Sequence, residues 1–373
     1  MVYLVGLLLI VLLGIAVAVA AKLQKVMGSI KSESDAETPA PNNKINAALW
    51  IFFLIAGSIG VIWSYLSAKA YFLPEASAPH GRDTDSQFWF DMGLLTVAFF
   101  IVNFLLFFFS WKYQYKKGYK ATFYPEDHKL ELIWTAIPAV IMAVLVFLGF
   151  RSWTHIMSDA PADSQVVEIM GKQFGWIVRY GGIQDNKLGN YNYKLIDDNN
   201  NNPSGIDYSD EASFDDFINV SEMHVEVGKP VSLKIRARDV LHSVYIPHMR
   251  VKMDAVPGMP TKFWFIPDKS TEQMRAETGN PNFDYEIACT EVCGRGHFAM
   301  RLRLIVEDKA SVDAWKQQQK PVLSTILEAD PKFITKIPEK LRAKAMDYAP
   351  YVEESDSTTA TTGSATATSA SLR

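Results

Sequence analysis

The chain has 373 residues, a formal net charge of −4 at pH 7 and a charged fraction of 21%. This balance gives no support to a nucleic-acid binder, which usually carries a basic stripe. Two cysteines are too few for a disulfide-rich scaffold, a multi-cysteine iron–sulfur protein or a zinc site of four cysteines. The mean hydropathy of +0.02 is an average over very unequal parts of the chain.

Four segments contain no Lys, Arg, Asp or Glu: residues 1–21, 45–68, 92–111 and 132–150. About 20 residues at 1.5 Å each suffice to cross a hydrocarbon core of roughly 30 Å as a helix. The sequence therefore excludes a purely soluble protein and predicts about four membrane helices, of which the last two form a hairpin. We also expect Pro138 to kink the last of them.

The first charge-free segment has a second interpretation as a secretory signal peptide, because Ala18 to Ala20 offer a small-residue cleavage pattern. Signal peptides begin with basic residues, whereas Lys22, Lys25 and Lys31 all follow this segment. We favour a retained helix, and cleavage stays open as the alternative.

Lysines gather in two loops, one between the first and second segments and one between the third and fourth. These lysines are Lys22, Lys25, Lys31, Lys44, Lys112, Lys116, Lys117 and Lys120. The positive-inside rule places both loops in the cytoplasm. Four crossings, or the hairpin alone, then place everything after Arg151 on the outer face.

From Ser152 onward the composition becomes that of a water-soluble domain with many short strands. Apolar and polar residues alternate over residues 231–238 and 300–304, which is typical of strands with one buried face. Further strands are predicted at residues 165–170, 173–180, 223–227, 262–266 and 285–288. Such a series of short strands indicates a sandwich or barrel.

The remaining segments are interpreted by composition. Residues between Tyr180 and Glu222 form a polar insertion that we expect to be a surface loop without a core. Helices are predicted at residues 311–319, capped by Ser311, and at residues 339–346. The predicted organisation is an extension with two membrane helices at 1–70, a helix hairpin at 86–152, a β-domain at 153–310, a helical extension at 311–353 and a disordered tail at 354–373.

The segment Cys289-Thr-Glu291-Val-Cys293-Gly-Arg-Gly-His297-Phe-Ala-Met300 brings two thiols, an imidazole and a thioether together at the end of a predicted strand. This is the ligand set of copper in electron-transfer sites. Two bridging thiolates could hold two copper ions. A disulfide between the cysteines is the open alternative in an exported domain, and zinc accounts less well for a thioether.

A further imidazole is expected from outside this segment. His242, in Asp-Val-Leu-His-Ser, follows an alternating strand and is the best candidate, with His248 as the competitor. His155 and His224 match no pattern, and we expect them at the surface.

These motifs, Cys-x-Glu-x-Cys-Gly-x-x-His-x-x-Met with Asp-Val-Leu-His-Ser and Lys-x-Asp-Ala-x-Pro-Gly, resemble subunit 2 of the haem–copper cytochrome c oxidases. The resemblance covers Gln87 to Asp308. It implies a cupredoxin-like Greek-key β-domain after the helix hairpin, on the periplasmic face of a bacterial inner membrane. It also implies a two-copper CuA centre, and electron transfer from a cytochrome c to a haem-containing subunit that reduces O2 and pumps protons.

The resemblance also implies roles for single residues. The copper ligands would be His242, Cys289, Cys293, His297, Met300 and, through its backbone carbonyl, Glu291. The Glu291 side chain would bind a magnesium ion shared with the large subunit. Lys252 and Asp254 would contact that subunit, an ordinary surface ion pair being the alternative. Glu131, in the segment that includes Trp134, would lie at the mouth of a proton-conducting path.

Three positions depart from the family pattern. Phe174 stands where the family has a tryptophan that passes electrons to copper, and Trp176 follows in the same aromatic string. Val244 replaces another tryptophan and Met259 replaces an arginine. The electron donor therefore stays open between a cytochrome c and a haem c domain of another respiratory complex. The chain has no Cys-x-x-Cys-His and so no covalent haem of its own.

Other expected partners are subunit 1, the other oxidase subunits and membrane lipid. Between Ser152 and Asp308 there are 16 basic and 23 acidic residues, a balance of 16 − 23 = −7 that suits attraction of a basic cytochrome. Two alternative functions stay open: a copper-free quinol oxidase subunit, and a membrane-anchored copper chaperone or sensor.

Overall fold

The structure is a computed structural model that describes residues 11, 13–23, 26, 42–116, 119–120, 122–182 and 186–349. The chain divides into two compact units. The first comprises Met1–Ala70 and Asp91–Val140, and the second comprises Tyr71–Phe90 and Ile141–Arg373. The predicted tail at 354–373 lies outside the described residues.

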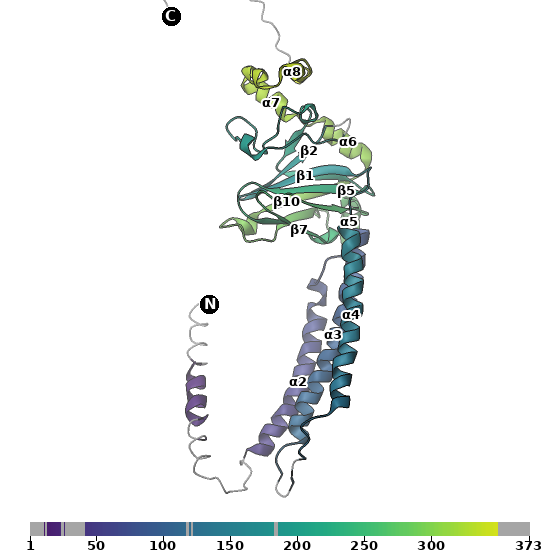
Figure 1. Cartoon of the computed structure of the whole chain (residues 1–373), viewed down its shortest axis with the longest axis vertical. Coiled ribbons are helices and arrows are strands. Elements are labelled where there is room, and N and C mark those ends of the chain that lie inside the picture. Colours follow the sequence, from purple (N-terminus) through teal and green to yellow (C-terminus); the bar gives the residue numbers. More distant parts are fainter. Residues whose placement is uncertain are drawn as a thin grey trace, which may run out of the picture. The chain divides into compact units, whose positions relative to one another are not determined.

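Three helices in the described part of the chain are long and apolar enough to cross a membrane. They are α2 (Asn43–Ala68), α3 (Pro79–Lys112) and α4 (His128–Ile156), shown in Figure 1. Each contains one of the predicted spans, which confirms them. A shorter apolar helix at Leu13–Leu23 overlaps the first span, of which residues 1–10 and 12 lie outside the described residues.

Local signals explain where these helices begin and pack. Asp127 precedes α4, and its Oδ1 accepts hydrogen bonds from the backbone N–H groups of Lys129 and Leu130, both at 3.1 Å. In the first unit, the Phe107 ring of α3 stacks on Trp50 of α2 with centroids 5.6 Å apart. Aromatic contact thus joins two helices whose other side chains are mostly exposed.

The second unit contains two five-stranded sheets that stack face to face (Figure 1). The first sheet has the order β3-β2-β1-β5-β8 and comprises β1 (Gln165–Lys172), β2 (Gly175–Tyr180), β3 (Phe217–Asn219), β5 (Val231–Ala237) and β8 (Thr261–Phe265). The second has the order β4-β10-β9-β6-β7 and comprises β4 (Glu222–Glu226), β6 (His242–Ile246), β7 (Val251–Ala255), β9 (Tyr285–Cys289) and β10 (Arg301–Glu307). Membrane helices followed by a cupredoxin-like β-sandwich are the predicted fold class, which is confirmed.

The sandwich core follows from the period of two in the strands. On β5, Val231, Leu233 and Ile235 are fully buried, while the intervening Lys234 is exposed. They meet Leu304 and Ile287 of the opposite sheet in one apolar cluster. This cluster also contains both cysteines and Met300. The metal-site candidates are therefore built into one end of the main core.

The prediction that the insertion between Tyr180 and Glu222 is a surface loop without a core is wrong. Its Ile206, Tyr208 and Phe214 are buried in a second apolar cluster. Their partners come from α7 (Val322–Ala329), the 3-10 helix η6 (Pro331–Lys336) and α8 (Glu339–Met346). We call this cluster and the segments that form it the C-terminal lobe. The insertion has too few apolar residues to form a core alone, and the C-terminal helices supply the rest.

A buried ion network attaches the insertion to the first sheet. Arg179 donates to both oxygens of Glu168 at 3.0 and 3.2 Å and to Asp216 Oδ2 at 3.0 Å. All three side chains are at most 2% exposed. Burial raises the pKa of Asp216 to about 7, although the positive charge of Arg179 opposes that shift. Arg236 also bonds Glu168, at 2.7 Å, so that two cations face two carboxylates.

Two smaller predictions are also wrong. Asp308, rather than Ser311, caps α6 (Lys309–Gln317), because the Asp308 carboxylate accepts from the Ser311 N–H. His224 is buried at 7% exposure instead of lying at the surface. Its ring stacks on Trp315 of α6 with centroids 4.1 Å apart, and it contacts the carboxylates of Glu222 and Glu307, both at 3.1 Å.

Candidate metal centre

Two neighbouring strands and one loop position the candidate ligands. His242 is the first residue of β6 and Cys289 is the last residue of β9. The strands are antiparallel, with Val244 opposite Cys289, so both residues lie at the same end of the sheet. The chain then leaves β9 as a loop and returns through a 3-10 turn at His297–Ala299 into β10. This return brings the later residues of the motif back to Cys289.

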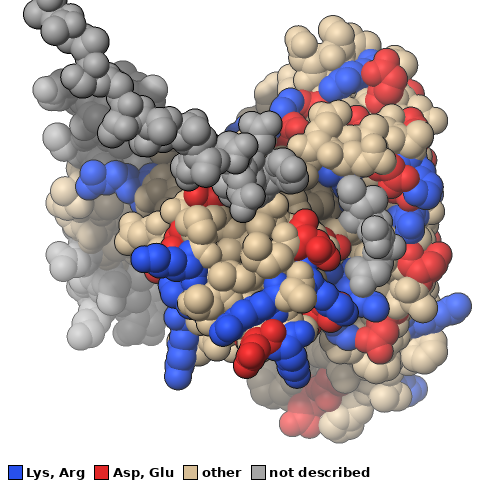
Figure 2. All heavy atoms as spheres, turned by 90° about the horizontal axis from the view of Figure 1, so that it is seen from above, with Lys and Arg blue, Asp and Glu red and all other residues tan. Residues whose placement is uncertain are grey.

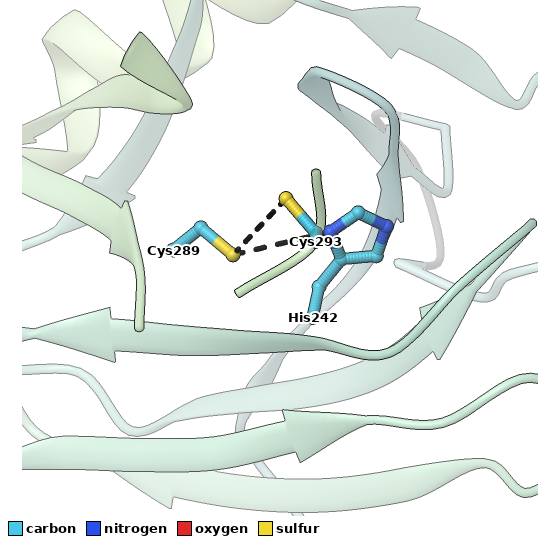
Figure 3. Close-up of side chains that lie close together, drawn as sticks. All are labelled: His242, Cys289 and Cys293. Carbon is cyan, nitrogen blue, oxygen red and sulfur yellow. Dashed lines mark hydrogen bonds between the residues drawn. The ribbon is translucent and has the colours of Figure 1, made fainter. Parts of the chain in front are cut away.

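The side chains converge on the two thiols (Figure 3). Cys289 Sγ lies 4.0 Å from Cys293 Sγ and 3.9 Å from His242 Nδ1. Cys293 Sγ lies 3.7 Å from His297 Nδ1 and 3.8 Å from Met300 Sδ. Figure 3 shows Cys289 Sγ directed toward both Cys293 and the His242 ring. Every side chain predicted as a copper ligand therefore lies within one small cluster.

The backbone of Glu291 completes this group. Its carbonyl oxygen lies 3.2 Å from Cys289 Sγ, while its side chain is exposed. One residue thus presents its main chain to the thiols and its carboxylate to the surroundings.

The donor set fits a soft metal held in a dry environment. Both cysteines are free, and His242 and Met300 are 0% and 1% exposed. Burial, together with the neighbouring Cys289 thiol, raises the pKa of Cys293 to about 11. A bound cation would reverse this preference, because coordination favours the thiolate. Thiolate, imidazole and thioether donors together suit copper better than zinc.

Residues behind the ligands fix their orientation. Asp239 Oδ1 lies 2.9 Å from His242 Nε2, so the other ring nitrogen, Nδ1, faces the thiols. The Asp239 carboxylate also accepts from the backbone N–H of Gln173 at 2.8 Å. Gln173 in turn donates from its side chain to the Cys293 carbonyl at 2.6 Å. One chain of hydrogen bonds therefore joins the His242 loop to the cysteine loop.

Gly171 leaves the space that the His242 ring occupies. A Cβ at Gly171 would lie 2.7 Å from His242 Cδ2, closer than real Cβ atoms approach. The strand β1, which carries Gly171, packs across the sandwich from β6. The absence of a side chain here is what allows the imidazole to be fully buried.

The two aromatic candidates for electron acceptance lie at different depths. Phe174 is 44% exposed, and its ring covers the cysteine loop, since a Cβ at Gly296 would lie 2.5 Å from it. Gly294, with a φ of 134°, approaches the same ring. Trp176 is only 2% exposed and its ring lies 6.0 Å from that of His242. Phe174 thus lies at the surface above the site, and Trp176 lies within the core beside a ligand.

Other candidates from the sequence lie elsewhere. His248 packs edge-on against Phe283 and Tyr285, with ring centroids 5.2 and 5.3 Å away, and is not among the residues gathered at the thiols. Glu131 lies in the first turn of α4, in the other unit, with His128 Nδ1 at 3.3 Å. Lys252 and Asp254 are exposed at alternate positions of β7. His155 is exposed, as expected.

Sequence reasoning missed Asp239, Gln173 and Gly171 as supporting residues. Asp239 stands three residues before His242, a spacing that offered one signal for a carboxylate behind a ligand. Gln173 and Gly171 depend on the packing of β1 against β6, which no local pattern reveals.

Comparison with known proteins identifies the family of the chain. The family model for the transmembrane domain of cytochrome c oxidase subunit II matches residues 65–153, and that for its periplasmic domain matches residues 165–308. The alternative cytochrome c oxidase subunit 2 of Bradyrhizobium diazoefficiens is 35% identical over 277 residues, which cover 74% of this chain and 92% of that protein. Subunit 2 of Thermostichus vulcanus is 26% identical over 310 residues, covering 75% and 88%.

Among solved structures, the periplasmic domain of subunit II of cytochrome oxidase from Bradyrhizobium japonicum is 20% identical. It aligns over 42% of this chain and 94% of that domain with a TM-score of 0.27. The family matches and the identity to a near full-length relative lead to one conclusion: the chain belongs to the cytochrome c oxidase subunit II family.

Proposed function

We propose that this chain is the electron-accepting subunit of an aerobic terminal oxidase and holds a binuclear copper centre of the CuA type. It accepts electrons from a cytochrome c, or from a haem c domain of another complex, on the periplasmic side of a bacterial inner membrane. It passes them to the haem-containing subunit 1, where O2 is reduced and protons are pumped.

The convergence of the donor atoms on two free thiols carries this proposal. Residues from β6, from the end of β9 and from the loop before β10 meet there, and the thiols lie 4.0 Å apart. Two metal-bridging thiolates need such a pair, whereas a copper-free subunit has no use for it. Copper held by these residues would supply one-electron transfer there.

Apolar side chains at the surface surround the ligands. Val292 and Phe298, next to Cys293 and His297, are each 80% exposed. Leu241, which precedes His242, and Phe174 are also exposed. Exposed apolar side chains clustered beside a buried redox site favour a docking partner. We assign this surface to the contact with the electron donor.

Charge gives weaker support to donor docking. The acidic balance between Ser152 and Asp308 suits a basic donor. Figure 2, however, shows Lys and Arg mixed with Asp and Glu over the face that it presents, without a broad field of one sign. The proposed docking therefore rests on the exposed apolar side chains next to the proposed copper ligands.

Two further roles belong to this proposal. The exposed Glu291 carboxylate is free to bind a magnesium ion shared with subunit 1, since hard oxygen donors suit magnesium. Lys252 and Asp254, exposed on β7, contact the same subunit.

Copper content and its electron-spin signal test the proposal. The full-length chain, purified from copper-replete membranes, is expected to hold two copper ions and to show a mixed-valence signal shared by both nuclei. One copper with a localised signal would favour a chaperone or sensor. A chain without copper would favour a quinol oxidase subunit, and either result would refute the proposal.

Gly171→Ala tests the packing behind the ligand. The added methyl group must displace the His242 ring, so we expect copper affinity to fall by roughly 10–100-fold, as when a partner behind a ligand is lost. Gly175→Ala is the matched control, because a Cβ there meets nothing within 4 Å. Competition with a chelator measures both variants, and equal affinities would contradict the assigned role.

Glu131→Gln tests the proposed proton role. We expect slower oxidase turnover in the assembled complex with copper content unchanged, because an amide cannot release a proton. Oxygen consumption and copper content are measured on the same preparation. Glu126→Gln is the matched control, since Glu126 is an exposed carboxylate just before α4. Turnover equal to that of the unmodified complex would remove Glu131 from the proton path.

A further inference from the structure

A cavity lies away from the metal centre, between the beginning of α3 and the end of α4. Its volume is about 770 Å³, within the roughly 300–1,000 Å³ typical of ligand pockets. All of its lining residues belong to one compact unit, that of the β-sandwich. None of the proposed copper ligands lines it.

His80 gives this cavity an unsatisfied polar group. Its side chain lines the cavity, the residue is only 9% exposed, and Nε2 is buried without a hydrogen-bond partner. The ring packs against Phe263 with centroids 5.8 Å apart, which restricts its orientation. Buried polar atoms are nearly always hydrogen-bonded, so this nitrogen marks a position where a partner is missing among the described residues.

Opposite charges flank the same cavity. Asp83 of α3 and Arg151 of α4 both line it and are exposed. Neither forms an ion pair with another residue in the part of the chain that the structure describes. A ligand that carries one positive and one negative group would match this pair, whereas a simple anion would meet the Asp83 carboxylate.

The cavity also lies where the apolar membrane segments end. Only Asp91 separates Phe90 from the charge-free segment 92–111, and Leu148 lies near the end of segment 132–150. Arg151 follows that segment directly. Residues at such a position sit at the boundary between water and hydrocarbon. A ligand with a polar headgroup and apolar chains would have its headgroup in polar surroundings and its chains in hydrocarbon.

We propose that this cavity binds the headgroup of a zwitterionic phospholipid with a primary amine. Its phosphate pairs with Arg151, its ammonium pairs with Asp83, and the ammonium also donates to His80 Nε2. A guanidinium suits phosphate oxygens, and a primary ammonium has three N–H donors. A quaternary amine has none and cannot satisfy His80. The inference is independent of the copper proposal, because the two sites share no residue.

Native mass spectrometry of the delipidated full-length chain in detergent tests this inference. Phosphatidylethanolamine and phosphatidylcholine with identical acyl chains are added at equal concentration. We expect about tenfold more bound phosphatidylethanolamine, the effect of about one charge-assisted hydrogen bond. Equal retention of the two lipids would overturn the proposal. Displacement of the bound lipid by an equal concentration of soluble phosphoethanolamine would also overturn it, since the acyl chains would then contribute nothing.

Substitutions of residues that line the cavity test where the lipid binds. His80→Leu and Arg151→Gln are each expected to reduce bound phosphatidylethanolamine about tenfold. The matched controls are His128→Leu and Arg301→Gln, whose parent side chains are 85% and 63% exposed and lie outside the cavity. Because His80 is buried, Arg151→Gln at the exposed rim decides the result if His80→Leu does not fold. Unchanged lipid binding in a folded Arg151→Gln variant would overturn the proposal.

Discussion

Replacing Cys293 with serine is expected to abolish the shared mixed-valence signal and to lower copper affinity by more than about 100-fold. Loss of a hydrogen-bond partner behind a metal ligand already costs roughly 10–100-fold. Cys293 is itself a proposed copper ligand. Its Sγ lies within 4.0 Å of Cys289 Sγ, His297 Nδ1 and Met300 Sδ. A serine hydroxyl is a hard donor that does not bridge two copper ions.

The measurement is copper content together with the electron-spin spectrum of the full-length variant. Cys289→Ser is expected to behave in the same way, because both thiolates bridge in the proposed centre. Thr290→Ser, at an exposed position between the two cysteines, is the control and should retain both copper ions. A shared signal that survives in either cysteine variant would eliminate bridging thiolates.

Arg179→Leu is expected to destabilise the β-sandwich by about 3–5 kcal/mol, the usual cost of removing one partner from a buried ion pair. The change leaves Glu168 and Asp216 buried, at 1% and 0% side-chain exposure, without their shared cation. Arg236 remains near Glu168 but makes no bond to Asp216 in the described structure. The insertion should loosen first, because Arg179 also donates to the Gly189 carbonyl.

Thermal unfolding of the full-length chain, followed by tryptophan fluorescence, measures this loss. Arg301→Leu is the matched control, since its pair with Glu286 is more than half exposed on both sides and is worth about 1 kcal/mol or less. Similar midpoints for the two variants would show that the buried network contributes no more than a surface pair.

The metal centre was predictable because its chemistry is concentrated in a short segment. Cys289, Cys293, His297 and Met300 are ligand types that rarely recur at fixed spacing within 12 residues. His242 was found because it follows directly on an alternating strand. The competing His248 could be set aside only with the structure, which places its ring in an aromatic cluster.

What the sequence did not reveal depends on contacts between distant segments. The polar insertion looked unable to form a core because its buried residues, Ile206, Tyr208 and Phe214, stand among Asn, Asp and Ser. Their apolar partners, such as Leu323 and Ile326, lie in α7. Hydrophobic periodicity describes only one helix or strand at a time. It therefore cannot reveal a core that two weakly apolar segments share.

The C-terminal lobe has a practical consequence for any soluble fragment of this protein. The periplasmic family model ends at residue 308, before α7 and α8 begin. A fragment cut there would uncover Ile206 and Phe214, and would remove the Val322 N–H that bonds the Asp216 carbonyl at 2.8 Å. Such a fragment would expose an apolar surface to water and is expected to aggregate during expression. Extending the fragment to residue 349 keeps this surface covered.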